Sequence, residues 1–198
     1  MLIFWKQRLA FLATPKAGSS AIEAALEPLA ELAVTRPPEL KHVSARDFRT
    51  HFAPFLSAQA GAPFTTIALM REPIDWLRSW YRFRLFDGGA SDPALASAYS
   101  FEQFARDFMA GPKPGSIDIP TQAEFLCDAS GTPLVDRIFP YERIGDFVHF
   151  LEDNLDFAIT LPRVNVPPAA DVGLSAETEA ALRETMARDL ALYAQICQ

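Results

Sequence analysis

Three short segments have the pattern of buried β-strands. They cover residues 9–13, 65–70 and 135–139, and each is followed by a turn that contains Pro and charged residues. Short apolar segments of this length, bounded by turn residues, are typical of strands inside a sheet. Residues 41–43 form a shorter segment that could close a further strand.

Longer segments carry apolar residues at helical spacing, such as Leu77, Tyr81 and Leu85 at i, i+4 and i+8. Pro28 is expected to kink or end the first of these helices. Strands that alternate with helices predict an α/β fold, a central parallel sheet flanked by helices in a single domain over residues 1–198. Helices are predicted over residues 20–32, 74–86, 100–109, 121–127 and 146–155, after Ser44 and after Ser175.

Size and composition fit one packed domain. The chain has 198 residues, of which 49% are hydrophobic and 16 are Phe. No apolar run approaches the roughly 18–20 residues that span a bilayer. The start, M-L-I-F-W-K-Q-R, lacks the pattern of a signal peptide. We therefore expect a cytoplasmic protein without a membrane span.

The charge balance narrows the class of ligand. A formal net charge of −7 argues against nucleic-acid binding, which needs a basic surface. A small anionic ligand is still compatible, because a local positive site can exist in an acidic protein. Cys127 and Cys197 lack metal-ligand spacing and are expected to be reduced thiols, and His42, His51 and His149 form no ligand cluster. We expect no metal.

Residues 9–24 contain the first candidate for anion binding. A predicted strand leads through a turn with Lys16 and Gly18 to a helix that begins near Ser19. The N–H groups at a helix N-terminus can bind an anion, and a lysine in the turn adds a positive charge. The Walker pattern is not met, because Lys16 precedes its glycine. A simple strand–turn–helix connection with a solvent-facing lysine is the open alternative.

The second candidate follows the predicted strand at residues 65–70. Arg71 stands at the carboxyl end of that strand, where ligands bind in open α/β sheets. Ser79 lies two turns into the next helix, so both side chains could face one anion. Alternatively, Arg71 pairs with Glu72 or Asp75, and Ser79 lies on the helix surface. Two such sites at two strand ends suit a ligand with two separated anionic groups.

These segments resemble the motifs of one enzyme family. T-P-K-A-G-S-S, residues 14–20, resembles the 5′-phosphosulfate loop of PAPS-dependent sulfotransferases, and R-E-P-I-D-W-L-R-S-W-Y, residues 71–81, resembles their 3′-phosphate motif. The order and separation of the two segments also fit. Residues 141–151 and 161–165 look like downstream segments of the bacterial and Golgi-type branch, which acts on carbohydrates.

The resemblance implies a three-layer, P-loop NTPase-like fold and the donor 3′-phosphoadenosine-5′-phosphosulfate (PAPS), used without a metal. It implies transfer of a sulfuryl group to a hydroxyl of a small-molecule acceptor, with a carbohydrate favoured. By the same resemblance Arg71 and Ser79 bind the 3′-phosphate, and Arg163 in its irregular segment has a donor-side role. The residues implied to surround the 5′-phosphosulfate are Lys16, Ala17, Gly18, Ser19 and Ser20.

Sulfuryl transfer depends on positioning and on charge stabilisation, as phosphoryl transfer does. Lys16 is the candidate for stabilising the charge on the leaving phosphate. A hydroxyl acceptor needs a general base, for which His42 is the candidate and an exposed loop histidine the alternative. Residues 87–100 and 111–120 are expected to shape the acceptor site. A nucleotide kinase and a non-catalytic nucleotide-binding protein remain as alternative functions.

Overall fold

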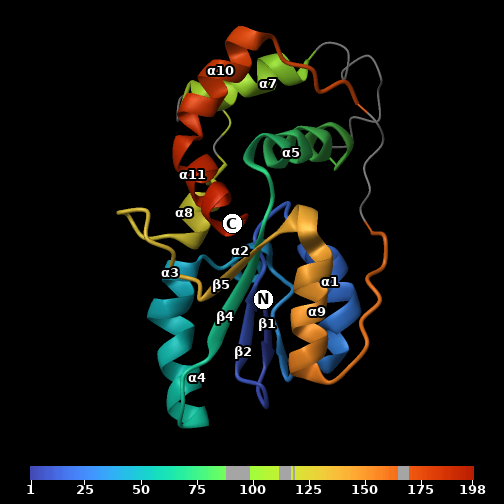
Figure 1. The fold of residues 1–198 in the computed structure, drawn as a ribbon, viewed down its shortest axis with the longest axis vertical. Helices are drawn as coiled ribbons and strands as arrows, with labels where there is room; N and C mark the ends of the chain where they lie inside the picture. The colour runs from blue at the N-terminus through green and yellow to red at the C-terminus, as the bar shows by residue number, and fades with distance from the viewer. Residues whose placement is uncertain (88–98, 112–116, 118, 165–169) are drawn as a thin grey trace.

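The structure is a computed structural model that describes residues 1–87, 99–111, 117, 119–164 and 170–198. Within these residues, five strands and a larger set of helices follow one another along the chain (Figure 1). The strands are β1 Leu2–Phe4, β2 Leu9–Leu12, β3 Leu32–Ala33, β4 Thr65–Met70 and β5 Arg137–Pro140. The helices are α1 Ser19–Leu26, η1 Glu27–Leu29, α2 Pro38–Lys41, α3 Ala45–Asp47, η2 Phe48–Phe52, α4 Ala53–Ala60, α5 Pro73–Asp87, α7 Phe101–Met109, α8 Gln122–Leu126, η3 Tyr141–Arg143, α9 Ile144–Leu155, α10 Ala176–Thr185 and α11 Ala187–Ile196.

The five strands form one mixed sheet in the order β3-β1-β2-β4-β5. Strands β2, β4 and β5 are parallel, whereas β1 pairs antiparallel with both β2 and β3. The α/β class is therefore confirmed, but the prediction of a parallel sheet is wrong on the β1–β3 side. The physical reason is the short connection at residues 5–8, because a turn of this length can only reverse the chain into a hairpin.

The strand predicted at residues 65–70 is confirmed as β4, which is buried over all but its first residue. Burial on both faces explains its continuous apolar sequence. By contrast, the strand predicted at residues 41–43 is wrong. The chain forms the short helix α2 there, because Pro38 suits the first helical turn and the N–H of His42 donates back to the Pro38 carbonyl at 2.9 Å.

Two other predicted helices differ from the structure. The helix predicted over residues 20–32 ends as α1 at Leu26, because Pro28 supports only the 3₁₀ turn η1, and β3 then follows. The final predicted helix is divided at Met186 into α10 and α11. Both differences concern helices, and neither changes where the parallel strands β2, β4 and β5 end.

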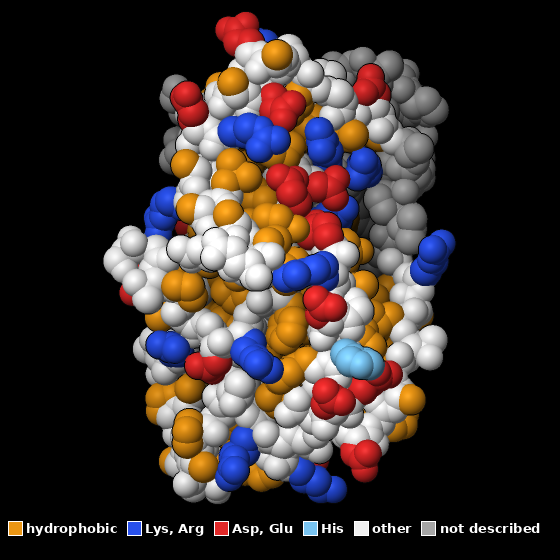
Figure 2. Space-filling model, in the orientation of Figure 1, with side chains coloured by type: hydrophobic (Ala, Val, Ile, Leu, Met, Phe, Trp, Pro, Cys, Tyr) orange, Lys and Arg blue, Asp and Glu red, His pale blue; other side chains and the backbone are white. Residues whose placement is uncertain are grey.

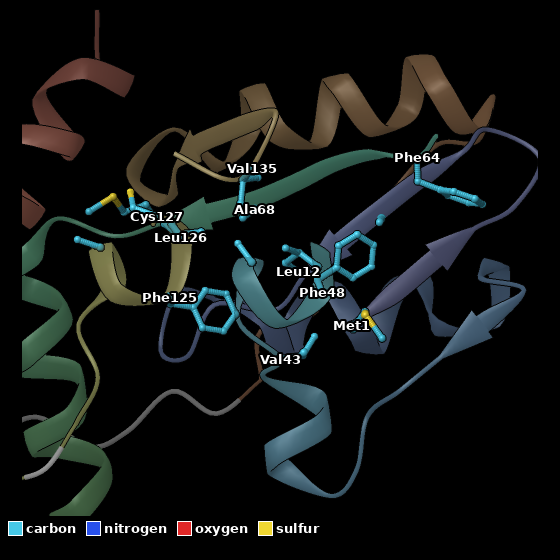
Figure 3. Close-up of a cluster of buried hydrophobic side chains, with 14 of the residues drawn as sticks. Met1, Leu12, Val43, Phe48, Phe64, Ala68, Phe125, Leu126, Cys127 and Val135 are labelled. Atoms are coloured by element: carbon cyan, nitrogen blue, oxygen red, sulfur yellow. The ribbon is translucent and has the colours of Figure 1, made fainter. Parts of the chain in front are cut away.

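Helices cover both faces of the sheet (Figure 1). On one face the sheet packs against α1 and α9 through an apolar cluster that includes Phe11, Ile22 and Phe147. The opposite face packs against α3, α4 and α8, and Figure 3 shows part of this second cluster around Leu12 and Phe48. The two clusters make a layered α/β core that fixes where each strand ends.

A third apolar cluster lies beyond the carboxyl ends of the parallel strands, where α5, α7 and α10 pack together (Figure 1). It is built around aromatic side chains, including Trp76, Tyr81, Phe101 and Phe104. This helical cluster, formed by α5, α7 and α10, stands over the edge at which the candidate anion-binding segments emerge.

The surface carries both signs of charge. On the face shown in Figure 2, Lys and Arg side chains alternate with Asp and Glu side chains over most of the molecule. Within the described residues, no helix combines the length and apolar character needed to cross a bilayer.

Candidate functional site

The first anion-binding segment, residues 13–18, connects β2 to α1 in a tight turn. Lys16 and Gly18 both adopt left-handed backbone conformations, with φ of 60° and 83°. Gly18 is the N-cap of α1, and among the described residues no side chain caps the first N–H groups of that helix. The Ala21 N–H already donates to the Gly18 carbonyl at 3.1 Å, so the N–H groups before it are the donors that an anion would use.

The side chains of this segment divide into buried and accessible ones. Ala17 is 1% exposed and packs in the cluster between the sheet and α1, so its backbone is the part that can meet a ligand. Ser19 is buried as well, whereas Ser20 is half-buried. The segment is therefore anchored by Ala17 and presents Gly18 and the first turn of α1.

Lys16 lies against aromatic side chains of α5. Its Nζ atom is 3.9 Å from the ring centroid of Phe83 and 5.8 Å from that of Trp80. These are cation–π distances. The alternative of a solvent-facing lysine is therefore wrong, because the side chain turns toward the helical cluster and is half-buried.

Arg71 emerges beside this segment because β2 and β4 are parallel neighbours. Leu12, the last residue of β2, pairs with Ala68, two residues before the end of β4. The Trp76 indole Nε1–H donates to the Pro15 carbonyl at 3.0 Å and fastens α5 to the turn. The two predicted anion-binding segments are thus brought together at one edge of the sheet.

The Arg71 guanidinium is already oriented by two neighbours. Its Nε and Nη2 atoms donate to Asp75, the Nε distance being 2.7 Å, and its Cζ lies 5.0 Å from the ring centroid of Tyr141. The predicted alternative of an Arg71–Asp75 pair is therefore confirmed. It engages one edge of the guanidinium, and the Nη1 side is the edge that a phosphate would take.

Ser79 lies on α5, on the same helical face as Asp75 and one turn further along. It is 8% exposed, so the alternative of a surface serine is wrong. Among the described residues, no hydrogen bond joins Ser79 to Arg71, which pairs with Asp75 on this face.

His42 is the C-cap of α2 rather than the end of a strand. Its Nδ1 lies 2.6 Å from the carbonyl oxygen of Ala13, which assigns the proton to Nδ1 and leaves Nε2 as the basic nitrogen. Burial lowers the pKa of His42 from its ordinary 6.5, and the nearby Lys41 ammonium lowers it further, against the opposing Ala13 carbonyl. The half-buried His42 is thus a neutral imidazole beside Ala13, the first residue of the segment 13–18.

Arg163 is exposed in the irregular segment that follows α9. Among the described residues, no hydrogen bond or ion pair joins it to Lys16, Arg71 or His42. Most of the segments predicted to shape the acceptor site, residues 87–100 and 111–120, lie outside the described residues, as does residue 165.

Two side chains from distant parts of the sequence hold the Arg71–Glu72 turn. The amide of Gln122 accepts from the Arg71 N–H at 2.9 Å and donates to the Arg71 carbonyl at 2.8 Å. The Glu142 carboxylate accepts from the Glu72 N–H at 2.9 Å and from the Tyr193 hydroxyl at 2.6 Å. Gln122 was not singled out from the sequence, because its burial and its contact with Arg71 appear only in the structure.

The site is rich in cations and backbone donors. Within the described part of the chain, no group of three or more His, Cys, Asp or Glu side chains could hold a metal ion. The groups here whose chemistry suits an anion are Lys16, Arg71 and the N-terminus of α1. Comparison with known proteins found no matching family model, no matching curated protein and no matching solved structure.

Proposed function

We propose that this chain is a PAPS-dependent sulfotransferase with a P-loop NTPase-like fold. The observation that carries the proposal is that the β2–α1 turn and Arg71 follow the carboxyl ends of two neighbouring parallel strands, with the Trp76–Pro15 hydrogen bond joining the turn to α5. Ligands of open α/β sheets bind at such an edge. A donor with separate 5′-phosphosulfate and 3′-phosphate groups matches the two cationic segments, and the motif resemblance favours PAPS over other nucleotides.

Each segment has a defined role in this proposal. The N–H groups at the start of α1 and the Lys16 ammonium bind the 5′-phosphosulfate, and Arg71 with Ser79 binds the 3′-phosphate. Lys16 stabilises the negative charge that builds on the bridging oxygen as the sulfur–oxygen bond breaks. Its cation–π contacts with Phe83 and Trp80 support the role, because they hold the ammonium beside the turn. Arg163 has a donor-side role on the resemblance alone.

His42 is the proposed general base. As the acceptor oxygen forms its bond to sulfur, the hydroxyl proton passes to the Nε2 atom of His42, and adenosine 3′,5′-bisphosphate leaves with the bridging oxygen. The Nδ1–H bond to the Ala13 carbonyl supports this role, because it leaves Nε2 as the nitrogen that accepts a proton. The proposed acceptor is a carbohydrate hydroxyl, which rests on the resemblance to the carbohydrate-directed branch.

Thermal unfolding with different nucleotides tests the proposal. Adenosine 3′,5′-bisphosphate should raise the melting temperature by about 5–10 °C at roughly 100 times its Kd. ATP with Mg²⁺ should raise it much less, because ATP has no 3′-phosphate for Arg71. A larger shift with ATP and Mg²⁺ would instead favour a nucleotide kinase and contradict the proposal.

Two variants make this experiment more specific. The second measurement is sulfuryl transfer from a labelled PAPS donor to a panel of carbohydrate acceptors. Lys16→Ala should abolish transfer and reduce the shift with the bisphosphate. Lys6→Ala is the matched control, since Lys6 is an exposed lysine in the β1–β2 turn. Turnover retained by Lys16→Ala would remove the role assigned to Lys16.

A further inference from the structure

The ring of Tyr141 lies between the two anion-binding segments. Tyr141 directly follows β5, and because Met70 pairs with Pro140 it emerges level with Arg71. The β2–α1 turn, Arg71 and Tyr141 therefore follow three neighbouring parallel strands at one edge of the sheet. This position gives one side chain access to both segments.

The first contact is with Gly18. A β-carbon at Gly18 would lie only 2.6 Å from the Cε2 atom of Tyr141 and 3.0 Å from Cδ2. The aromatic ring thus occupies the space that any other residue at position 18 would need. Gly18 also has a φ of 83°, which favours glycine independently. The turn and the ring therefore fix one another's positions.

The second contact is with Arg71. Its guanidinium carbon lies 5.0 Å from the centre of the Tyr141 ring, while Asp75 holds the Nε edge. A ring against one surface and a carboxylate against one edge leave the guanidinium little freedom to rotate. Removing the ring would release one of these two constraints and leave the other.

We infer that Tyr141 is a positioning residue that couples the two anion-binding segments through its ring. It sets the turn at Gly18, and with it the N–H groups of α1, and it sets the plane of the Arg71 guanidinium. The inference rests on the proposed function for the identity of the two anions, a 5′-phosphate group and a 3′-phosphate group. The ring carries the effect, so the phenol hydroxyl is dispensable.

The affinities for two mononucleotides, 5′-AMP and 3′-AMP, report on the two segments separately. Tyr141→Leu should weaken 5′-AMP and 3′-AMP alike, each by about threefold to tenfold, because both segments lose a preorganising contact. Arg71→Met should weaken the binding of 3′-AMP alone. Tyr141→Phe keeps the ring and should bind both ligands as the wild type does. Loss of affinity for just one mononucleotide in Tyr141→Leu would overturn the inference.

Phe139→Leu is the matched control for removing an aromatic ring from β5. The Phe139 ring packs against Phe147 and Phe150, with centroids 5.3 Å apart in both cases, on the side of α9. This variant should unfold more easily than the wild type and still bind both mononucleotides normally. If Phe139→Leu weakens the binding of both mononucleotides as Tyr141→Leu does, the loss of affinity reflects general stability and the inference fails.

A double-mutant cycle without ligand distinguishes this inference from the proposed function. If the wild type binds neither mononucleotide, the proposed function fails while the coupling stays testable. Gly18→Ala should cost less unfolding free energy in the Tyr141→Ala background than in the wild type, because the clash with the ring is gone. Equal costs in the two backgrounds would overturn the inference.

Discussion

Arg71 is held in place before any ligand arrives. Asp75 engages one edge of its guanidinium, the ring of Tyr141 contacts its face, and Gln122 holds its backbone N–H and carbonyl. A cation oriented in this way loses little conformational freedom when a phosphate binds. Lys16 is likewise held beside its turn by the rings of Phe83 and Trp80.

The protonation of His42 predicts the pH dependence of transfer. The pKa of His42 is lowered from 6.5, chiefly by burial, so the neutral base persists to a lower pH than in an ordinary histidine. Transfer should fall as the pH drops through a value below 6.5, and it should be level near pH 7. Because a general base contributes about 10²–10⁴-fold, His42→Ala should lose a factor of this order. The measurement is the pH profile of kcat/KM.

His149→Ala is the control for this profile. His149 lies on α9 with its side chain 84% exposed and its Nδ1 atom 3.6 Å from a Glu152 oxygen. Its replacement should leave both the rate and the profile unchanged. A His42→Ala variant that keeps the wild-type rate would exclude His42 as the base.

At the scale of elements, local sequence signals were sufficient for β4 and α5. The apolar run at residues 65–70 and the helix-starting Pro73 are both contained within a few neighbouring residues. The two-residue strand β3 could not be predicted in this way, because it exists only through its pairing with β1. Strand β1 was missed as well, although the short connection at residues 5–8 is a local feature that favours an antiparallel hairpin.

In the candidate site, too, local features could be predicted from the sequence and long-range contacts could not. The positions of Lys16 and Arg71 after strands β2 and β4 were predictable, because each strand has a recognisable apolar sequence. The contacts of Gln122 with Arg71 and of Tyr141 with Gly18 join residues far apart in the sequence. No local pattern carries that information, so only the three-dimensional structure reveals what holds the two segments.

Helix α8 links α11 to the Arg71 turn, which leads to a prediction for Gln122. The buried Asp189 of α11 accepts from the Ala123 N–H of α8 at 2.9 Å, and the next residue back, Gln122, holds Arg71. Gln122→Ala should lower the free energy of unfolding by about 1–3 kcal/mol, because the Arg71 backbone groups lose their partner. It should also weaken binding of adenosine 3′,5′-bisphosphate. Denaturant unfolding and calorimetric titration measure the two effects.

Gln103→Ala provides the comparison. Gln103 is an exposed glutamine on α7 whose amide donates to Asp107 at 2.8 Å. Its loss should change stability by no more than about 0.5 kcal/mol and leave ligand binding intact. Equal effects of the two substitutions would show that Gln122 does not support Arg71.

At the scale of the whole molecule, the site lies where two bodies of side-chain packing meet. The sheet and its covering helices form one, and the helical cluster of α5, α7 and α10 forms the other. The Trp76–Pro15 hydrogen bond crosses between them at the anion-binding turn. The position of the turn therefore depends on both bodies rather than on the β2–α1 connection alone.

Two tryptophans on α5 allow this link to be tested by the same substitution. Trp76 is 1% exposed and its indole N–H is bonded to Pro15, whereas the buried indole N–H of Trp80 has no hydrogen-bond partner among the described residues. Trp76→Phe should lower the free energy of unfolding by about 1–3 kcal/mol and weaken the bisphosphate, because the turn loses its anchor. Trp80→Phe should cost less, since it removes an unpaired donor. Urea unfolding and bisphosphate titration of both variants measure these effects. A larger loss of stability and affinity in Trp80→Phe than in Trp76→Phe would show that the hydrogen bond does not anchor the turn.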